Sequence, residues 1–327
     1  MFHVVKNGYV SFLHKMNYTV NMELKKIIVA SNEQNQRLDV FLVVQFPEYS
    51  RSFLKTQIQN GNITLNSKKV NAGIKIKSGD DIQLNLPTLE NISIKPEKNI
   101  PINIIYEDND FITINKQSGI VVHPSESTPA HTLVNGLIAY YPDIISVGDD
   151  PKRPGIVHRL DKDVSGIMVI AKNQRAFDHL KIQFKERSVK KKYIALVYGR
   201  IIPDNGTINT PIGRSKSQPN RMSVKRIGDG KEAETHYKTT KNFKDYTLLE
   251  IEIKTGRTHQ IRVHLLSKGN PIVGDSTYYL KRMAKKTGMN RIFLHAYHIQ
   301  FADLNGNLLK FNANIPEELD QFLKQLT

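Results

Sequence analysis

Two apolar runs flank a short charged segment near the middle of the chain. The runs are residues 155–157 and 167–171, and short apolar runs bounded by polar residues are typical of buried strands. Five ionisable side chains lie between them: His158, Arg159, Asp161, Lys162 and Asp163. Because charged side chains are rarely buried unless they are paired, the pattern predicts two core strands joined by a charged loop at the edge of a sheet.

The composition narrows the class of partner. The chain has 327 residues, enough for two domains, and its 47 lysines and arginines outnumber 31 acidic residues to give a net charge of +16. This surplus favours a polyanionic partner, with nucleic acid ahead of an acidic membrane surface. A basic protein without such a partner is the open alternative.

The absence of cysteine excludes several kinds of chemistry. Disulfides, zinc sites built on thiolates and cysteine nucleophiles all require a residue that this sequence lacks. The composition fits a reducing cytoplasm, where we expect the protein to be located. No segment approaches the roughly 18 uninterrupted apolar residues of a membrane-spanning helix, so no membrane partner is expected.

The first hundred residues predict a tail, a small domain and a linker. Residues 1–23 form an N-terminal tail, for which disorder and a later translation start are both open. Residues 24–88 combine strand patterns with two helices, the second of which starts after Ser50, a favourable N-cap. Residues 89–101 contain two prolines and no clear period, which indicates a linker. The strands of the small domain are expected at residues 24–29, 63–70 and 74–86.

The remainder of the chain, residues 102–327, predicts a larger α+β domain. Its strand and helix patterns do not alternate regularly, which favours an α+β arrangement over a doubly wound parallel sheet. A helix is expected from Thr258, as its N-cap, to Lys268, just before Gly269. The other expected elements are strands at residues 193–198 and 248–254 and a final helix at 317–325.

Asp161 is the strongest candidate for chemistry. It follows Leu160 at the predicted end of a strand, where a carboxylate can project into a cleft and act as a nucleophile or a general base. A buried arginine would lower the pKa of such a carboxyl and keep it ionised, and Arg262 in the predicted helix is a candidate partner. From the pattern alone, a loop-capping aspartate and a surface arginine explain the two residues equally well.

Two other patterns do not support a cofactor or a metal. Residues 228–233 match the letters of a dinucleotide-binding fingerprint, but no apolar strand precedes them, which indicates a turn. His259 and His264 would point about 140° apart on a helix, and His295 and His298 would point to opposite faces of a strand. Neither pair has the geometry of a zinc site, so no metal is expected.

The small domain resembles the RNA-binding domain named after ribosomal protein S-four. The resemblance rests on Arg37-Leu38-Asp39, on residues 50–55 and 63–66, and on residues 77–80, all in register. It implies a helix-helix-strand domain whose two helices present basic side chains to structured RNA. Ordinary solvated charges are the alternative for each of these side chains. The basic side chains at the matching positions are Arg37, Arg51 and Lys55.

Four further segments resemble motifs of the RluA family of RNA pseudouridine synthases. Residues 155–166 are similar to the motif that contains H-R-L-D, and residues 115–124, 192–199 and 256–264 are similar to three other motifs. With the small domain, the resemblance covers residues 24–326. It implies an α+β catalytic domain in which a mixed, mostly antiparallel sheet carries a central cleft.

Two positions depart from the motifs of this family. Gln117 stands where proline is usual, and Val164 stands where threonine is usual. These departures affect the stiffness of one loop and one hydroxyl hydrogen bond. Both lie beside the matched residues rather than at them, so the reaction of the family is still expected.

The resemblance implies a role for each matched residue. Asp161 would attack either the uracil ring or the ribose anomeric carbon, and the detached uracil would rotate and rejoin through carbon. Arg262 would pair with Asp161, while Tyr193 would pack on the target base and assist proton removal. Arg159 would fill the gap that a flipped uridine leaves in its RNA stack. Further substrate-binding side chains are expected at His158, Lys116, His123 and Leu265.

The implied reaction is an isomerisation, which requires no cofactor and no metal. The pairing of the two domains points to large-subunit ribosomal RNA as the partner of a monomeric enzyme. A non-catalytic RNA-binding or ribosome-assembly protein on the same scaffold is the alternative function, and a hydrolase using Asp161 and Asp163 is a weaker one. Covalent uracil methyltransferases are excluded because they need a cysteine nucleophile.

Overall fold

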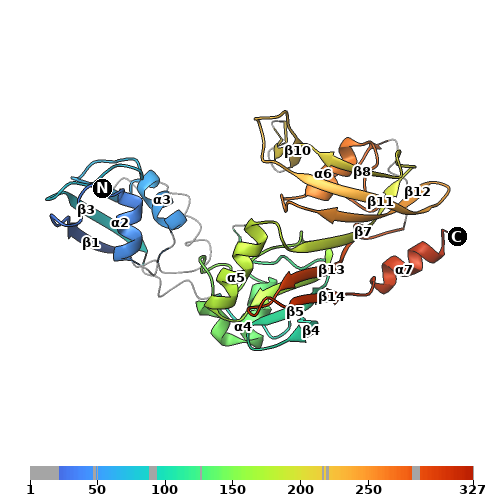
Figure 1. Cartoon of the computed structure of the whole chain (residues 1–327), viewed down its shortest axis with the longest axis horizontal. Coiled ribbons are helices and arrows are strands. Elements are labelled where there is room, and N and C mark those ends of the chain that lie inside the picture. The colour runs from blue at the N-terminus through green and yellow to red at the C-terminus, as the bar shows by residue number, and fades with distance from the viewer. Residues whose placement is uncertain are drawn as a thin grey trace, which may run out of the picture. The chain divides into compact units, whose positions relative to one another are not determined.

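The computed structural model describes residues 22–46, 49, 51–87, 94–125, 127–215, 217–218, 221–281 and 288–326. The predicted tail, apart from its last two residues, therefore lies outside the described residues, as do Ser50 and the first part of the predicted linker. The chain divides into two compact units (Figure 1). The smaller unit comprises Met1–Lys95, Ser125–Pro129 and Asp149–Lys152, and the larger unit comprises the remainder.

The smaller unit contains two helices and a three-stranded antiparallel sheet. Its strands lie in the order β1-β3-β2. Gly61, with φ of +81°, ends α3 in the left-handed conformation that glycine adopts without a steric penalty. β2 and β3 are shorter than the strands expected at residues 63–70 and 74–86. The elements are β1 (Met22–Ile28), α2 (Leu38–Gln45), α3 (Arg51–Asn60), β2 (Ile63–Leu65) and β3 (Asp81–Pro87).

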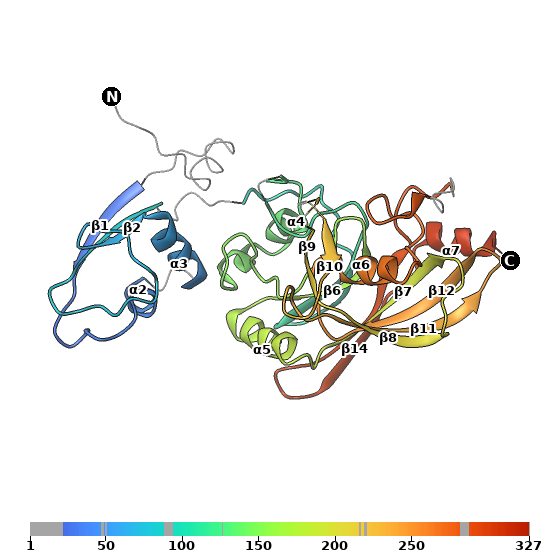
Figure 2. The same ribbon diagram turned by 90° about the horizontal axis from the view of Figure 1, so that it is seen from above.

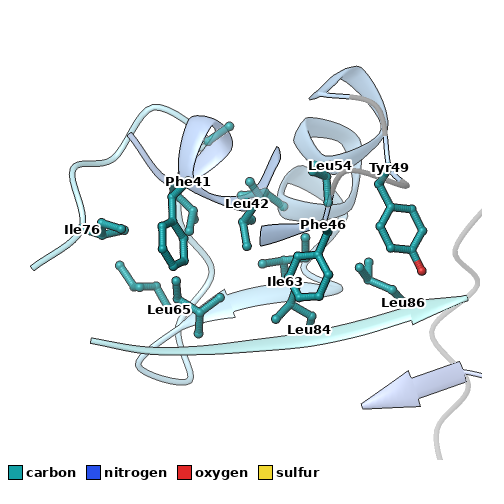
Figure 3. Close-up of a cluster of buried hydrophobic side chains, with 14 of the residues drawn as sticks. Phe41, Leu42, Phe46, Tyr49, Leu54, Ile63, Leu65, Ile76, Leu84 and Leu86 are labelled. Atoms are coloured by element: carbon teal, nitrogen blue, oxygen red, sulfur yellow. The ribbon is translucent and has the colours of Figure 1, made fainter. Parts of the chain in front are cut away.

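The hydrophobic core of the smaller unit lies between its helices and its sheet (Figure 3). Phe41 and Leu42 from α2 and Leu54 from α3 pack over Ile63 and Leu84 of the sheet, and all five are buried. Burying a side chain of this size contributes about 1.5–3 kcal/mol relative to leaving it in water. Each helix therefore turns its apolar face to the sheet and leaves the other face for polar side chains.

The larger unit is built on a nine-stranded mixed sheet (Figures 1 and 2). Its path runs β4-β5-β6-β13-β7-β12-β11-β8, and β14 pairs with β13 off this path. β6 and β13 are parallel, whereas the other pairings among its described strands are antiparallel. The expected α+β class with a mostly antiparallel sheet is confirmed. The strands are β4 (Ile104–Glu107), β5 (Phe111–Lys116), β6 (Ser165–Ala171), β7 (Lys190–Tyr198), β8 (Asn205–Asn209), β11 (Glu234–Asn242), β12 (Tyr246–Ile253), β13 (Leu294–Ala302) and β14 (Leu308–Asn312).

Helices and a short ribbon surround this sheet. α5 packs on β6, and α6 packs against β10 and β11 (Figure 2). Among the described helices, none is both long enough and apolar enough to span a bilayer. The elements are α4 (Leu133–Tyr140), the 3-10 helix η2 (Pro142–Ser146), α5 (Gln174–Lys185), the ribbon strands β9 (Ile212–Arg214) and β10 (Met222–Val224), α6 (Gln260–Ser267) and α7 (Glu317–Lys324).

The first of the two apolar runs does not form a strand. The second run lies in β6, which is buried throughout, but residues 155–157 make a single bridge between Ile156 and Ile170. Gly155 has φ of +70°, and a Cβ atom there would lie 2.6 Å from the carbonyl oxygen of Ala171. The chain turns tightly against β6 at this glycine, so the expected strand at residues 155–157 was wrong. The charged segment that follows is a loop leading into β6.

Candidate active site

Asp161 lies in the loop before β6 and lines a cavity. The preceding residue, Leu160, is buried and anchors this loop in the core. Oδ2 of Asp161 accepts a hydrogen bond of 3.2 Å from Nη1 of Arg262, which lies 101 residues further along the chain. The fold thus brings together two residues that belong to separate sequence motifs.

Arg262 projects from the first turn of α6 and is almost completely buried. Its Nε and Nη2 atoms donate hydrogen bonds of 2.7 and 2.8 Å to the two carboxylate oxygens of Asp275. Burial acts to lower the pKa of Arg262, but the hydrogen bonds and charges of Asp275, and then those of Asp161, outweigh it and raise this pKa. Arg262 is therefore a permanent cation, fixed by Asp275 and directed at Asp161.

Asp275 is a site residue that the sequence analysis missed. Its Oδ1 atom also accepts hydrogen bonds from the backbone N–H groups of Thr277 and Tyr278, so a tight turn holds the carboxylate in place. The signal was present in the sequence, because Asp275 follows an apolar run, residues 271–273, and a glycine. Asp161 was marked as a candidate on a similar ground, because it directly follows Leu160 at the predicted end of a strand.

A cavity of about 80 Å³ opens beside Asp161. Tyr193, from the middle of β7, forms one part of its wall, and the start of α6 forms another. Burial, and then the negative charge of Asp161, raise the pKa of Tyr193, so its phenol stays protonated at neutral pH. The cavity therefore places the carboxylate of Asp161 among apolar side chains and three arginines, Arg159, Arg257 and Arg262, which suits covalent chemistry on a small organic ring. The apolar residues in the wall are Leu160, Val164, Ile253, Ile261 and Leu294.

His259 is a second site residue without an expected role. Its backbone is left-handed, with φ of 57°, and it immediately precedes α6. Its Nδ1 atom lies 2.8 Å from the hydroxyl oxygen of Tyr278, and its Nε2 atom lies 3.9 Å from Oδ2 of Asp161. Burial lowers the pKa of His259 more than the charge of Asp161 raises it, so the ring is neutral at pH 7.

The turn before α6 is organised by Gln260 rather than by Thr258. The side-chain oxygen of Gln260 accepts hydrogen bonds from the hydroxyl of Thr255 and the backbone N–H of Arg257, at 2.7 and 3.0 Å. Its amide nitrogen donates to the carbonyl oxygen of Glu234. The expected cap at Thr258 was wrong, because α6 begins at Gln260. The buried side-chain amide of Gln260 instead fixes the loop that lines the cavity.

Comparisons with known proteins agree with this geometry. The sequence matches the family described as RNA pseudouridylate synthase over residues 110–267, and the S4 domain over residues 36–82. It is 42% identical over 293 residues to an RNA pseudouridine synthase of Aquifex aeolicus (strain VF5), covering 87% of this chain and 92% of that relative. The chain belongs to the RNA pseudouridine synthase family.

Two other comparisons extend this assignment. Ribosomal large subunit pseudouridine synthase D of Yersinia pestis is 36% identical over 310 residues, covering 91% of this chain and 93% of that protein. The structure of human RNA pseudouridylate synthase domain containing 1 matches with a TM-score of 0.56 and 26% identity, over 70% of this chain and 90% of that one. The protein is thus an isomerase that acts on uridine in RNA, as the resemblance of its motifs implied.

Arg159 lines the cavity of this synthase, and His123 and His158 lie close to Arg159 in sequence or in space. Arg159 is exposed and lines the wall with Asp161, and its Nη1 atom lies 3.4 Å from Nε2 of His123. The ring of His158 stacks on Phe184, and its Nε2 atom accepts a hydrogen bond from the backbone N–H of Val169. Burial lowers the pKa values of His123 and His158 to about 3, so both rings are neutral.

Lys116 and Leu265 do not line the cavity beside Asp161. The ammonium group of Lys116 is buried and donates to the backbone carbonyl oxygens of Gln117, Ile120 and Lys162. Burial lowers the pKa of Lys116 to about 7. Leu265 is fully buried on α6. Both side chains therefore contact other parts of the protein rather than the cavity. Through the carbonyl oxygen of Lys162, Lys116 connects the loop after β5 to the loop that carries Asp161.

The basic side chains expected on the S4 unit have different surroundings. Arg37 and Arg51 both donate to the carboxylate of Asp39, which is fully buried at the start of α2. Lys55, one turn after Arg51 on α3, is exposed. The arginines therefore combine a structural contact with an exposed guanidinium, whereas the structure shows for Lys55 only that it is exposed.

Metal ligands are not grouped in the part of the chain that the structure describes. No set of three His, Asp or Glu side chains there could hold a metal ion. His264, one of the histidines considered for a metal, instead lies between the hydroxyl of Thr235 and the carbonyl oxygen of Thr210, at 2.9 and 3.0 Å. This bonding satisfies both ring nitrogens of a neutral imidazole.

Proposed function

We propose that this synthase isomerises specific uridines of large-subunit ribosomal RNA to pseudouridine, with Asp161 as the nucleophile. The observation that carries the proposal is the ion pair between Asp161 and Arg262, at the wall of a cavity that Tyr193 also lines. The choice of RNA is supported by the relatives named ribosomal large subunit pseudouridine synthase D, which match over nearly their whole length.

The reaction makes one chemical demand on Asp161, which is that it be ionised. The carboxylate can attack either C6 of the uracil ring or C1′ of the ribose, and both routes lead to the same net conversion of uridine to pseudouridine. The N1–C1′ bond breaks, the uracil rotates, a C5–C1′ bond forms, the C5 proton leaves and N1 gains a proton. No atom is gained or lost, so the balance of this reaction requires no cofactor or metal. Arg262 stabilises the carboxylate and fixes its direction.

Tyr193 and Arg159 act on the substrate rather than on the bonds that change. The ring of Tyr193 packs on the uracil, and its raised pKa keeps the hydroxyl protonated, so we assign it no role as a base. Arg159 is exposed at the mouth of the cavity, where its side chain can occupy the gap left by a flipped uridine. Flipping costs a few kcal/mol, which such a replacement offsets in part.

The proposal includes an oligomeric state and a cellular compartment for the enzyme. The enzyme works as a monomer in this proposal, with the cavity built from residues of the larger unit. Ribosomal RNA as the substrate places that reaction in the cytoplasm. Arg37, Arg51 and Lys55 of the S4 unit would add affinity for RNA, since phosphate contacts position a protein without taking part in chemistry.

Asp161→Asn tests the proposal. The amide keeps the size of the side chain and removes both its charge and its nucleophilic oxygen. Turnover on unmodified large-subunit RNA should fall by at least about 10⁴-fold, while RNA affinity stays equal or rises slightly as one carboxylate is lost. Pseudouridine is measured by mass spectrometry of nuclease digests, and the sites are mapped in ribosomal RNA from cells with and without the gene.

Asp163→Asn is the matched control. Asp163 lies in the same loop and is exposed, and the reaction assigns it no step. Its variant should retain nearly full turnover. Measurable turnover by Asp161→Asn would show that another group is the nucleophile, and a parent protein that binds ribosomal RNA but modifies none would indicate the non-catalytic alternative.

A further inference from the structure

A second and larger cavity adjoins the one beside Asp161. Its volume is about 490 Å³, and the two cavities share Arg159, Tyr193 and Arg257 as wall residues. Lysines and arginines from the loop before β6, the end of α5, β7 and the loop before α6 line it. No carboxylate is among its lining residues in the described part of the chain. A wall of one charge around a concave space raises the local concentration of the opposite charge.

Lys191 is the buried cation of this cavity. Its side chain comes from β7 and is 9% exposed, and its ammonium nitrogen lies 5.1 Å from the centroid of the Phe184 ring. Among the described residues, no carboxylate lies within ion-pair distance of this nitrogen. Glu252, whose charge acts on Lys191, is paired with Lys254 at 2.6 Å. Burial, and then the charge of Lys254, lower the pKa of Lys191 to about 8.

An unpaired ammonium group in a buried position is costly unless an anion joins it. The fold could have supplied a carboxylate, as it does for Lys192, the next residue on β7, which pairs with Glu250 at 3.0 Å. It supplies none for Lys191. The cavity in front of Lys191 is instead left open and lined by further cations, which indicates that the anion comes from a ligand.

The geometry of β7 relates this anion to the substrate base. Side chains two residues apart on a strand point to the same face and are separated by about 7 Å, so Lys191 and Tyr193 face the same side. Both are buried and both line the larger cavity. A separation of this size is the scale of a single nucleotide. A base that packs on Tyr193 would therefore have a neighbouring backbone phosphate within reach of Lys191.

We propose that the larger cavity binds the RNA phosphate adjacent to the target uridine, with Lys191 as its principal ligand. The inference rests on the proposed function for the identity of the base at Tyr193. Arg257, which lines both cavities, completes the phosphate site from its rim. Lys191 is thus a substrate-positioning residue, which holds the strand while Asp161 reacts.

The test compares Lys191→Met with Lys190→Met. Methionine keeps the apolar stem and removes the charge. Lys190 is the preceding residue on β7, and it is exposed on the opposite face of the strand. Binding of unmodified large-subunit RNA is measured against salt concentration in the Asp161→Asn background, where no product forms. Lys191→Met should lose about tenfold in affinity and reduce the slope of log affinity against log salt by about 0.7, as expected for one phosphate contact.

The control and a charge-preserving variant sharpen the result. Lys190→Met should leave the affinity and the salt slope within error of the parent, and Lys191→Arg should restore most of the slope. A single methylphosphonate linkage beside the mapped uridine should weaken binding to the parent and have no further effect on Lys191→Met. The methylphosphonate result also decides the case if Lys191→Met does not fold, because an unaffected parent would overturn the proposal.

The outcomes separate this proposal from the proposed function. If the parent forms pseudouridine but Lys191→Met keeps both its affinity and its salt slope, the phosphate site is wrong and the reaction stands. If the parent forms no pseudouridine but Lys191→Met loses the slope, the phosphate site stands as part of an RNA-binding protein. A lower affinity with an unchanged slope would mean that Lys191 supports the structure and does not bind phosphate.

Discussion

The two units of this protein each contain a cluster of arginine and aspartate side chains, and the clusters are arranged in opposite ways. In the S4 unit, one buried carboxylate, Asp39, is held by Arg37 and Arg51, whose side chains are 48% and 52% exposed. In the synthase unit, one buried guanidinium, Arg262, lies between Asp275, which is fully buried, and Asp161, which is 18% exposed.

The member in the centre of each cluster decides which charge the protein presents. A central anion holds two cations at the surface, where they can meet phosphate groups. A central cation, neutralised on one side by Asp275, holds the other carboxylate at a cavity, where it can meet a substrate ring. Pairing lowers the cost of the buried charge in both cases, but only the second arrangement keeps a carboxylate at the wall of a cavity.

The largest expected effect comes from removing the central cation. Arg262→Met leaves the charge of Asp275 buried without its partner, which should cost about 3–5 kcal/mol of stability. It also releases Asp161 from its fixed direction, so turnover should fall by at least about 100-fold. Urea unfolding measures the stability, and single-turnover formation of pseudouridine at saturating RNA measures the activity.

A double variant separates these two consequences. Arg262→Met combined with Asp275→Asn removes the unpaired buried charge, so most of the lost stability should return. The activity should not return, because Asp161 still lacks its cation. Recovery of turnover together with stability would show that Arg262 acts only on folding. The cluster in the synthase unit would then have no role in catalysis beyond stability.

Removing the central anion of the other cluster should have a smaller effect. Asp39→Ala leaves Arg37 and Arg51 without their shared acceptor, but both guanidinium groups are half-exposed and can turn to water. We expect a loss of about 1–3 kcal/mol in the S4 unit, since a hydrogen-bonded charged group is removed. RNA affinity should fall as the arginines lose their orientation, whereas turnover at saturating RNA should stay near that of the parent. A large loss of turnover at saturation would contradict the separation of roles.

Acid should weaken the S4 cluster in a defined direction. The hydrogen bond from Arg37 is the largest influence on Asp39, and this carboxyl has a pKa below its ordinary value. The folded state then binds fewer protons than the unfolded state, whose carboxyl titrates near about 3.9. The stabilisation is complete only above about pH 5, and it is lost as the pH falls from there through the folded pKa. Hydrogen exchange of peptides from α2 and α3 should show this loss, and Asp39→Asn should show less of it.

Local patterns in the sequence were sufficient for several helices. Such signals predicted the start of α3 after Ser50 and both ends of α7 to within about two residues, because they depend on the helix itself. The strand expected at residues 155–157 was wrong because strand formation depends on a partner, and Gly155 turns the chain after a single bridge to β6.

The site was harder to predict because its contacts cross the chain. The motifs placed Asp161 and Arg262 on separate segments, and the resemblance implied a pairing that the fold now brings to 3.2 Å. Asp275 was missed because no short motif links it to Arg262, although it completes the cluster. The sequence also could not show that Arg37 and Arg51 share a buried acceptor, since Asp39 has the ordinary pattern of a helix N-terminal residue.

The smallest expected effect concerns a cation outside both clusters. Lys55 is exposed on α3, and its side chain has no carboxylate to hold it among the described residues. Lys55→Met should weaken RNA binding by a few-fold at low salt and reduce the salt slope by about 0.7–0.9, as one phosphate contact is lost. Stability and saturating turnover should not change.

Lys26→Met provides the control for that measurement. Lys26 follows Lys25 on β1 and precedes Ile27, which packs on the core, so its side chain points away from the helices, where it pairs with Asp81 at 3.2 Å. Its removal should leave the salt slope unchanged. Equal losses for Lys26→Met and Lys55→Met would mean that the S4 unit attracts RNA through its overall charge, in which case the orientation that Asp39 imposes on its two arginines would matter little for binding.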